Sequence, residues 1–359
     1  MKQLRANKGF HEILERDHPY IFIDACMQAW PDTDYPNAHR HGATCYAVTA
    51  CGVHDDLDAA LENLMSYHLA ARKNDSLRIA RTAEDIRRAK LAGGAALLMH
   101  AQGGEWLAGK LHRLEAFQQL GLRMMLPAYN RSNLLCGGCL EPSDGGFTSF
   151  GRAFIAEANR LGIVLDGSHV GYRSCREMID LSSDPVVFSH SNAKALVDSP
   201  RNISDELILA CTARGGIIGL APFGPLCFRS GSTTWPTLSD FLDHVDHVVQ
   251  LTGSTKAIGI GTDMSLGTYL LHPADPWAEP DYLSMGTEYA KHVSGDRRSP
   301  KRALADFNSY AEIWSLIGAL GERGYSDEDT AAILGGNFLR LFEQVWGGHG
   351  TADERHVVA

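Results

Sequence analysis

Short apolar runs rich in β-branched residues alternate with longer amphipathic segments along most of this chain. Such alternation is typical of repeated strand-helix units that build a parallel sheet. Eight apolar runs are predicted as strands, at 20–26, 43–50, 95–102, 123–129, 163–168, 185–190, 217–222 and 257–263. Helices are predicted between them at 57–71, 110–120, 150–161, 173–181, 204–213 and 238–251.

Eight strands joined by crossover helices predict an α/β protein with a single (β/α)8 TIM-type barrel. The strands read as continuous apolar runs, as expected for a parallel sheet covered on both faces. Glycines after four helices are expected in the left-handed conformation that ends a helix: Gly121, Gly162, Gly215 and Gly253. No linker rich in Pro, Gly or Ser divides the chain, so one domain is predicted over 1–359, with extra helices at about 303–346.

Composition and charge argue against nucleic-acid binding and membrane association. The 359 residues are 44% hydrophobic and 21% charged, which is ordinary globular usage, and the net charge of −10 argues against a nucleic-acid partner. No apolar stretch is long enough for a signal peptide or a membrane span, so a cytoplasmic protein without membrane association is expected. The eight cysteines are spread through the chain and are expected to be reduced.

Polar residues follow several predicted strands at their carboxyl ends, where barrels of this type carry their active sites. His169, His190 and Asp263 end three of these strands and are expected to converge. Imidazole nitrogens and a carboxylate are suitable metal ligands, and a metal held there would acidify a water and polarise a carbonyl. Asp263 could accept the water's proton. The pattern predicts metal-assisted hydrolysis, with hydrogen-bonded structural histidines as the alternative.

Four segments resemble the membrane (renal) dipeptidase family of amidohydrolase-like metallopeptidases. They are FGRAFIAEANRLGIVLDGSHV from position 150, PVVFSHSNAKALVDSPRN from 185, AIGIGTDM from 257 and ILGGNFLRLFEQV from 333. The resemblance runs from Asp24 to Val345. It implies zinc ligation by His169 and His190, a grip on the substrate carboxylate by Arg201 and proton transfer by Asp263.

The first third of the chain departs from that family. The family pattern Asp-x-His-x-Asp on the first strand is Asp24-Ala-Cys26-Met-Gln28 here, and Gln102 stands where the family has a glutamate that bridges two metals. Because a neutral amide supplies no anionic bridge, we expect one zinc ion rather than two. Cys26 is either a soft ligand or an inert buried thiol. His100, on the same strand face as Gln102, could replace a missing ligand.

Tyr129 stands where the family has a histidine that contacts substrate, so Tyr129 and Asn130 are expected at the substrate. The expected function is a zinc-dependent hydrolase of a dipeptide or dipeptide-like amide with a free carboxylate. Two alternatives stay open: a diverged barrel enzyme that acts on another small carboxylated metabolite with one or no metal, and a catalytically silent homologue. The expected partner is a small molecule, and a homodimer is expected from base rates.

Overall fold

The computed structural model describes residues 18–29, 33–35, 42–266 and 303–347. Eight parallel strands form the barrel wall in the order β6-β5-β4-β2-β1-β9-β8-β7. Their bounds are β1 Ile23–Ala29, β2 Cys45–Cys51, β4 Ala95–Gln102, β5 Leu122–Leu126, β6 Val164–Leu165, β7 Val187–Phe188, β8 Ile217–Leu220 and β9 Ile258–Ile260. A parallel bridge between Asp166 and Val187 joins the two ends of this order, and the amide of Gly167 donates to the carbonyl of Val187 at 2.7 Å. The sheet is thereby closed into a (β/α)8 barrel.

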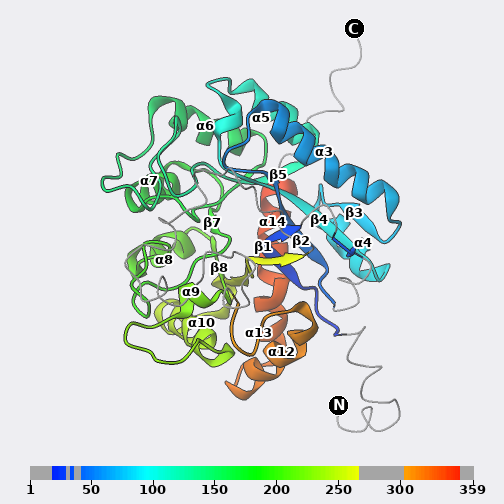
Figure 1. Ribbon diagram of the computed structural model, residues 1–359, viewed down its shortest axis with the longest axis vertical. Coiled ribbons are helices and arrows are strands. Elements are labelled where there is room, and N and C mark those ends of the chain that lie inside the picture. The colour runs from blue at the N-terminus through cyan, green and yellow to red at the C-terminus, as the bar shows by residue number, and fades with distance from the viewer. Residues whose placement is uncertain (1–17, 30–32, 36–41, 267–302, 348–359) are drawn as a thin grey trace.

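Helices lie around the outside of the strands, as Figure 1 shows from α3 and α5 through α7 and α8 to α10 and α12. The bounds are α3 Leu57–Lys73, α4 Ala83–Leu91, α5 His112–Gln119, α6 Ser149–Arg160, α7 Tyr172–Leu181, α8 Asp205–Ala213, α9 Gly224–Cys227 and α10 Leu238–Thr252. Side-chain caps fix the first turns of several of these helices. Thr148, for example, accepts from the amide of Gly151 at the start of α6, and Ser204 accepts from Leu207 at the start of α8.

The predicted barrel is confirmed, because each of the eight predicted runs overlaps one of these strands. All six predicted helices are present within a few residues of their predicted limits, and the four glycines after them have positive φ angles. The prediction missed the helices α4 and α9 and two short strands, β3 (Leu77–Ile79) and β10 (Met264–Leu266). Helix α4 is rich in charge, and its buried face consists of Ala83, Ile86 and Ala89, which gives a weak apolar signal.

The C-terminal part packs against the barrel. It contains the short helix η6 (Tyr310–Glu312), α12 (Ile313–Glu322), α13 (Asp327–Ala331), a π-helical turn (Ala332–Gly336) and α14 (Asn337–Gly347). On α14 the buried ring of Phe338 lies so close to Gly259 in β9 that a Cβ there would come within 2.1 Å of it. Within the described ranges, no helix combines the length and apolarity that crossing a bilayer requires.

Candidate active site

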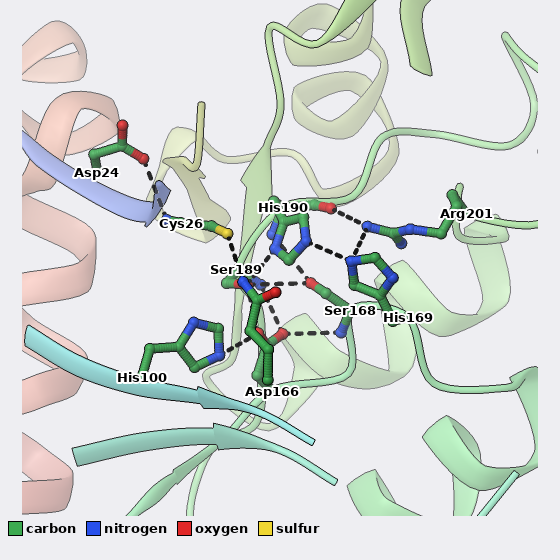
Figure 2. Close-up of polar contacts among 10 residues, drawn as sticks. Asp24, Cys26, His100, Asp166, Ser168, His169, Ser189, His190 and Arg201 are labelled. Carbon is green, nitrogen blue, oxygen red and sulfur yellow. Dashed lines mark hydrogen bonds and ion pairs between the residues drawn. The ribbon is translucent and has the colours of Figure 1, made fainter. Parts of the chain in front are cut away.

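His169 and His190 meet at the carboxyl ends of β6 and β7 (Figure 2). Their Nε2 atoms lie 2.8 Å apart, and both side chains are almost fully buried. Burial, reinforced by the nearby Arg201 guanidinium, holds the pKa of each imidazole well below its usual range. Both rings are therefore neutral, which is the form that binds a metal ion.

The hydrogen bonds of these two rings decide where their protons lie. The Nδ1 of His169 is 2.7 Å from the amide oxygen of Asn130, which can only accept, so this Nδ1 carries the hydrogen. Ser189 donates its hydroxyl hydrogen to Asp166, so its oxygen accepts from Nδ1 of His190 at 2.7 Å. Both Nε2 atoms then carry lone pairs that face each other, and that of His169 also accepts from the Arg201 guanidinium at 3.0 Å. Two facing lone pairs repel each other unless a cation or a donor hydrogen lies close to them.

A buried carboxylate holds the histidine of β7 in place. Asp166 accepts from the amides of Ser168 and Ser189 at 2.8 and 2.9 Å and from the Ser189 hydroxyl, and its Oδ2 is 3.1 Å from Nε2 of His100. We call these four residues the Asp166 cradle. Burial alone would raise the pKa of Asp166, but its contacts with His100, His190 and Ser189 outweigh burial and hold that pKa below its ordinary value. An ionised carboxylate thus supports His190 through the Ser189 hydroxyl.

Arg201 reaches the same histidine pair from the segment after β7. A parallel bridge between Ala193 and Ile203 folds that segment back on itself, so that Arg201 lies beside the strand ends. Its Nη2 is 3.0 Å from Nε2 of His169 and donates to the backbone carbonyl of His190 at 3.3 Å. The side chain is only 3% exposed. A buried planar guanidinium beside the histidines is suited to bind a substrate carboxylate with two parallel hydrogen bonds.

Tyr129 and Asn130 both contact His169. The Tyr129 ring stacks on the imidazole, with centroids 3.8 Å apart and planes at 21°. Asn130 fixes the other side of the ring through the hydrogen bond to Nδ1. Contact of either residue with substrate stays a prediction. Asn130 also orients the His169 ring, a role that the sequence did not indicate.

A second buried carboxylate lies at the end of β1. Asp24 accepts from the amide of Cys26 at 3.2 Å, from the amide of Thr262 at 2.8 Å, and from the hydroxyls of Thr262 and Tyr310 at 2.5 Å each. We call these four residues the Asp24 cradle. Asp263 follows Thr262 directly, and its amide donates to the carbonyl of Cys26 at 2.8 Å. The cradle therefore fixes the strand end that carries Asp263.

The positions that depart from the family pattern face one another without an anion among them. The amide of Gln102 donates to the Cys26 sulfur at 3.1 Å. Burial and the charges of Asp263 and Asp24 raise the pKa of the Cys26 thiol well above its usual value, so Cys26 is protonated. Within the described part of the chain, the side-chain oxygen of Gln28 is buried and has no hydrogen-bond partner.

The side chains gathered here offer two neutral imidazoles and no anionic ligand at the altered positions. His169 and His190 present two lone pairs to a single point, whereas Cys26, Gln28 and Gln102 are neutral. The Nε2 of His100 lies 3.1 Å from Asp166 Oδ2, and the role of His100 as a replacement ligand stays a prediction. Over residues 18–29, 33–35, 42–266 and 303–347, no group of three or more His, Cys, Asp or Glu side chains is arranged to hold a metal. Among these described residues, the histidine pair therefore supplies two nitrogen donors, and any metal held there would take its other ligands from water or substrate.

Backbone strain is concentrated at this site. Among the described residues, four other than glycine have positive φ angles, and three of them belong to the site: Asn130 at 61°, His169 at 65° and Asp263 at 53°. Each such conformation costs on the order of 1–3 kcal/mol and persists only where its surroundings enforce it. The strand ends therefore hold these side chains in imposed orientations, a common property of functional sites.

The structure adds supporting residues to the site. Asp166, Ser189 and Thr262 stood among the polar residues at strand ends, but no role followed from the sequence. A signal was available, since a Ser or Thr directly precedes both His190 and Asp263. Tyr310 had no such signal, because it lies in the C-terminal segment and reaches Asp24 over 286 positions of sequence.

The chain is similar to proteins of one family. Residues 29–272 match the family described as membrane dipeptidase, peptidase family M19. Dipeptidase tcpJ of Claviceps purpurea is 28% identical over 277 residues, which is 76% of this chain and 56% of that protein. Human dipeptidase 3 is 28% identical over 293 residues, which is 80% of this chain and 52% of that protein. This chain spans about half the length of these two curated relatives.

Solved structures agree with this assignment. An amidohydrolase from Pseudomonas aeruginosa is 28% identical and superposes with a TM-score of 0.77, over 91% of this chain and 97% of that one. A metallopeptidase named dipeptidase AC superposes with a TM-score of 0.70 at 22% identity, over 96% of both chains, which supports the fold. Since the family match covers more than half of the sequence, the chain belongs to the membrane dipeptidase family, peptidase family M19, a family of hydrolases of the metallo-dipeptidase type.

Proposed function

We propose that this protein is a zinc-dependent hydrolase that cleaves the amide bond of a dipeptide, or of a dipeptide-like molecule with a free carboxylate. The observation that carries the proposal is the pair of Nε2 lone pairs of His169 and His190, 2.8 Å apart, beside the buried guanidinium of Arg201. Relatives named dipeptidases support the substrate class. Family membership implies a metal cofactor.

In this proposal, His169 and His190 hold a single zinc ion. When bound, such an ion lowers the pKa of a water and polarises the carbonyl of the scissile amide. The neutral state of both imidazoles keeps their lone pairs ready for a cation. Asn130 and Ser189 hold the two rings so that their Nε2 atoms point to one place.

The remaining site residues bind substrate and move a proton. Arg201 binds the substrate carboxylate and so fixes the distance between that group and the scissile bond. Asp263, partly exposed at the end of β9, accepts the proton of the attacking water and can return it to the leaving amine. Tyr129 and Asn130 line the substrate position on the His169 side.

One contact favours a second candidate function. The Nη2 of Arg201 is 3.0 Å from the Nε2 lone pair of His169, where a metal ion would otherwise bind. A guanidinium in that place is compatible with a metal-free site that acts on another small carboxylated metabolite, or with a catalytically silent protein that binds one. Replacement of the family's histidine by Cys26, and of its two anionic residues by Gln28 and Gln102, favours the same alternative.

Several wider properties stay predictions. We propose a single barrel domain over 1–359, a small-molecule substrate, no association with nucleic acid or membrane, and a homodimer. A cytoplasmic location is supported by the eight cysteines, none of which is paired in a disulfide.

The experiment is hydrolysis of a panel of dipeptides and N-acyl amino acids by protein purified without chelator, then stripped of metal and reloaded with zinc. We expect turnover that is lost on stripping and restored by zinc. A matched variant, Arg201→Lys, keeps the positive charge but loses the planar fork, and we expect its KM to rise about tenfold with kcat less affected. Zinc-loaded wild-type protein that cleaves no member of the panel would contradict the proposal.

A further inference from the structure

Tyr310 enters the candidate site from outside the region that matches the family. The match covers residues 29–272, whereas Tyr310 begins η6 in the C-terminal segment. Its hydroxyl donates to Oδ2 of Asp24 and lies 3.4 Å from the hydroxyl oxygen of Thr262. The side chain is only 3% exposed, and its ring meets the edge of Tyr46, with centroids 5.6 Å apart and planes at 84°.

Local hydrogen bonds in the C-terminal segment fix the backbone on both sides of Tyr310. Ser309 and Glu312 form a capping box, in which the serine hydroxyl accepts from a backbone amide of η6 and the glutamate accepts from the amide of Ser309. Glu312 also accepts from the amide of Asn308 at 2.6 Å. These contacts set the direction in which the Tyr310 side chain leaves the chain.

The contact matters because Asp24 joins the ends of two strands. Its carboxylate binds the amide of Cys26 at the end of β1 and both the amide and the hydroxyl of Thr262 after β9. Asp263 comes next, in the left-handed conformation with φ of 53°, and its amide is bonded to the carbonyl of Cys26. The direction of the Asp263 side chain thus depends on how Asp24 ties β1 to β9.

We infer that Tyr310 is a positioning residue for Asp263, acting through Asp24 and Thr262. The Tyr310 hydroxyl is the fourth donor to the Asp24 carboxylate, and it binds Oδ2, the same oxygen that accepts from the Thr262 hydroxyl. The C-terminal segment thereby completes the active site as well as packing against the barrel. The kinetic part of this inference rests on the proposed function of Asp263.

The test is Tyr310→Phe, which removes the hydroxyl and keeps the ring that packs on Tyr46. We expect kcat to fall about tenfold and KM to change less than about twofold, because the variant disturbs proton transfer and leaves Arg201 in place. The matched control is Tyr325→Phe, which removes a hydroxyl that donates to Asp246 at 2.7 Å in another part of the fold. The control variant should keep the wild-type kcat.

Amide hydrogen exchange gives a readout that needs no activity. In Tyr310→Phe the peptide that covers 258–266 should exchange faster than in wild type, while the peptides of β4 and β5 stay unchanged and Tyr325→Phe changes neither. If the wild-type protein shows no hydrolytic activity but Tyr310→Phe still speeds exchange at 258–266, the proposed function is rejected and the positioning role is kept. Exchange at 258–266 that is unchanged, or accelerated equally across the barrel, would overturn the inference, as would an unchanged kcat in an active enzyme.

Discussion

The two buried carboxylate cradles have similar hydrogen bonds, but the pKa values of their carboxyl groups are shifted in opposite directions. Asp166 and Asp24 each accept from the amide two residues later, and from the amide and hydroxyl of a Ser or Thr on a neighbouring strand. Both are fully buried, but the pKa of Asp166 is lowered, whereas burial raises the pKa of Asp24 to about 6. The fourth neighbour differs: an imidazole, His100, beside Asp166 and a phenol, Tyr310, beside Asp24. The same hydrogen-bond geometry can therefore hold an anion firmly or weakly, according to the charge that its last neighbour can carry.

The site has two halves that differ in the same way: the histidine half, with His169 and His190 beside Asp166, and the altered half, with Cys26 and Gln102 beside Asp24. The Asp166 cradle supports His190, and the two histidines on that side keep their lone pairs for a cation. Beside the Asp24 cradle, the former ligand positions are a protonated thiol and a neutral amide bonded to each other. Our proposal therefore places the metal ion at the histidines, because Cys26 and Gln102 supply no anionic ligand.

The largest effect is expected from breaking the histidine pair. His190→Gln should abolish zinc binding and lower kcat/KM by more than the 10- to 100-fold that is typical of losing an outer partner of a metal ligand. Cys26→Ser, its counterpart in the altered half, should leave the zinc content unchanged. Elemental analysis and steady-state kinetics of both variants measure the contrast. Zinc lost from Cys26→Ser would mean that the thiol is a ligand and that the two halves are not distinct.

Replacing the two carboxylates should reveal their different environments. Asp166→Asn breaks a buried pair with His100 and should lower the free energy of unfolding by about 3–5 kcal/mol at neutral pH. Asp24→Asn should cost less, because the side chains that donate to that carboxylate in the described part of the chain are the hydroxyls of Thr262 and Tyr310. Urea unfolding of both variants gives the values. Equal losses would show that His100 contributes no charge to the Asp166 cradle.

The pH dependence of stability sharpens the same contrast. The pKa of Asp24 is about 6 in the folded protein against 3.8 ordinarily, so its stabilising contribution is complete well below pH 3.8 and is lost as the pH rises through 6. This loss is about 3 kcal/mol, and the advantage of wild type over Asp24→Asn should shrink by that amount between about pH 3 and 7. The pKa of Asp166 is lowered, so the advantage of wild type over Asp166→Asn should stay constant above pH 5 and fall in stronger acid. Unfolding curves at several pH values decide, and parallel curves for the two variants would contradict the assignment.

The smallest effect concerns the hydroxyls that precede the site residues. Ser189→Ala removes the acceptor of His190 Nδ1 and should weaken zinc binding about tenfold. Thr262→Val removes a similar hydroxyl from the Asp24 cradle and should leave zinc affinity unchanged. Competition with a zinc chelator measures both affinities. A loss of affinity in Thr262→Val as large as in Ser189→Ala would place the two cradles around one metal centre.

The barrel could be predicted from the sequence because its strands are continuous apolar runs, such as 95–102, separated by helices that end at glycine. The pairing of His169 with His190 followed from their places at neighbouring strand ends. The role of Asp166 did not follow, because a buried Asp before Gly and Ser could serve only the local turn. The contact from Tyr310 to Asp24 depends on how the C-terminal segment packs on the barrel, and no local pattern encodes that packing.

The central claim is that one half of the site retains a cation centre and the other half does not. Zinc content per chain, measured by elemental analysis on protein purified without chelator, tests this claim most directly. The account predicts one zinc ion per chain, bound through His169 and His190. A chain that carries no zinc after zinc supplementation, or one that carries two ions, would contradict it.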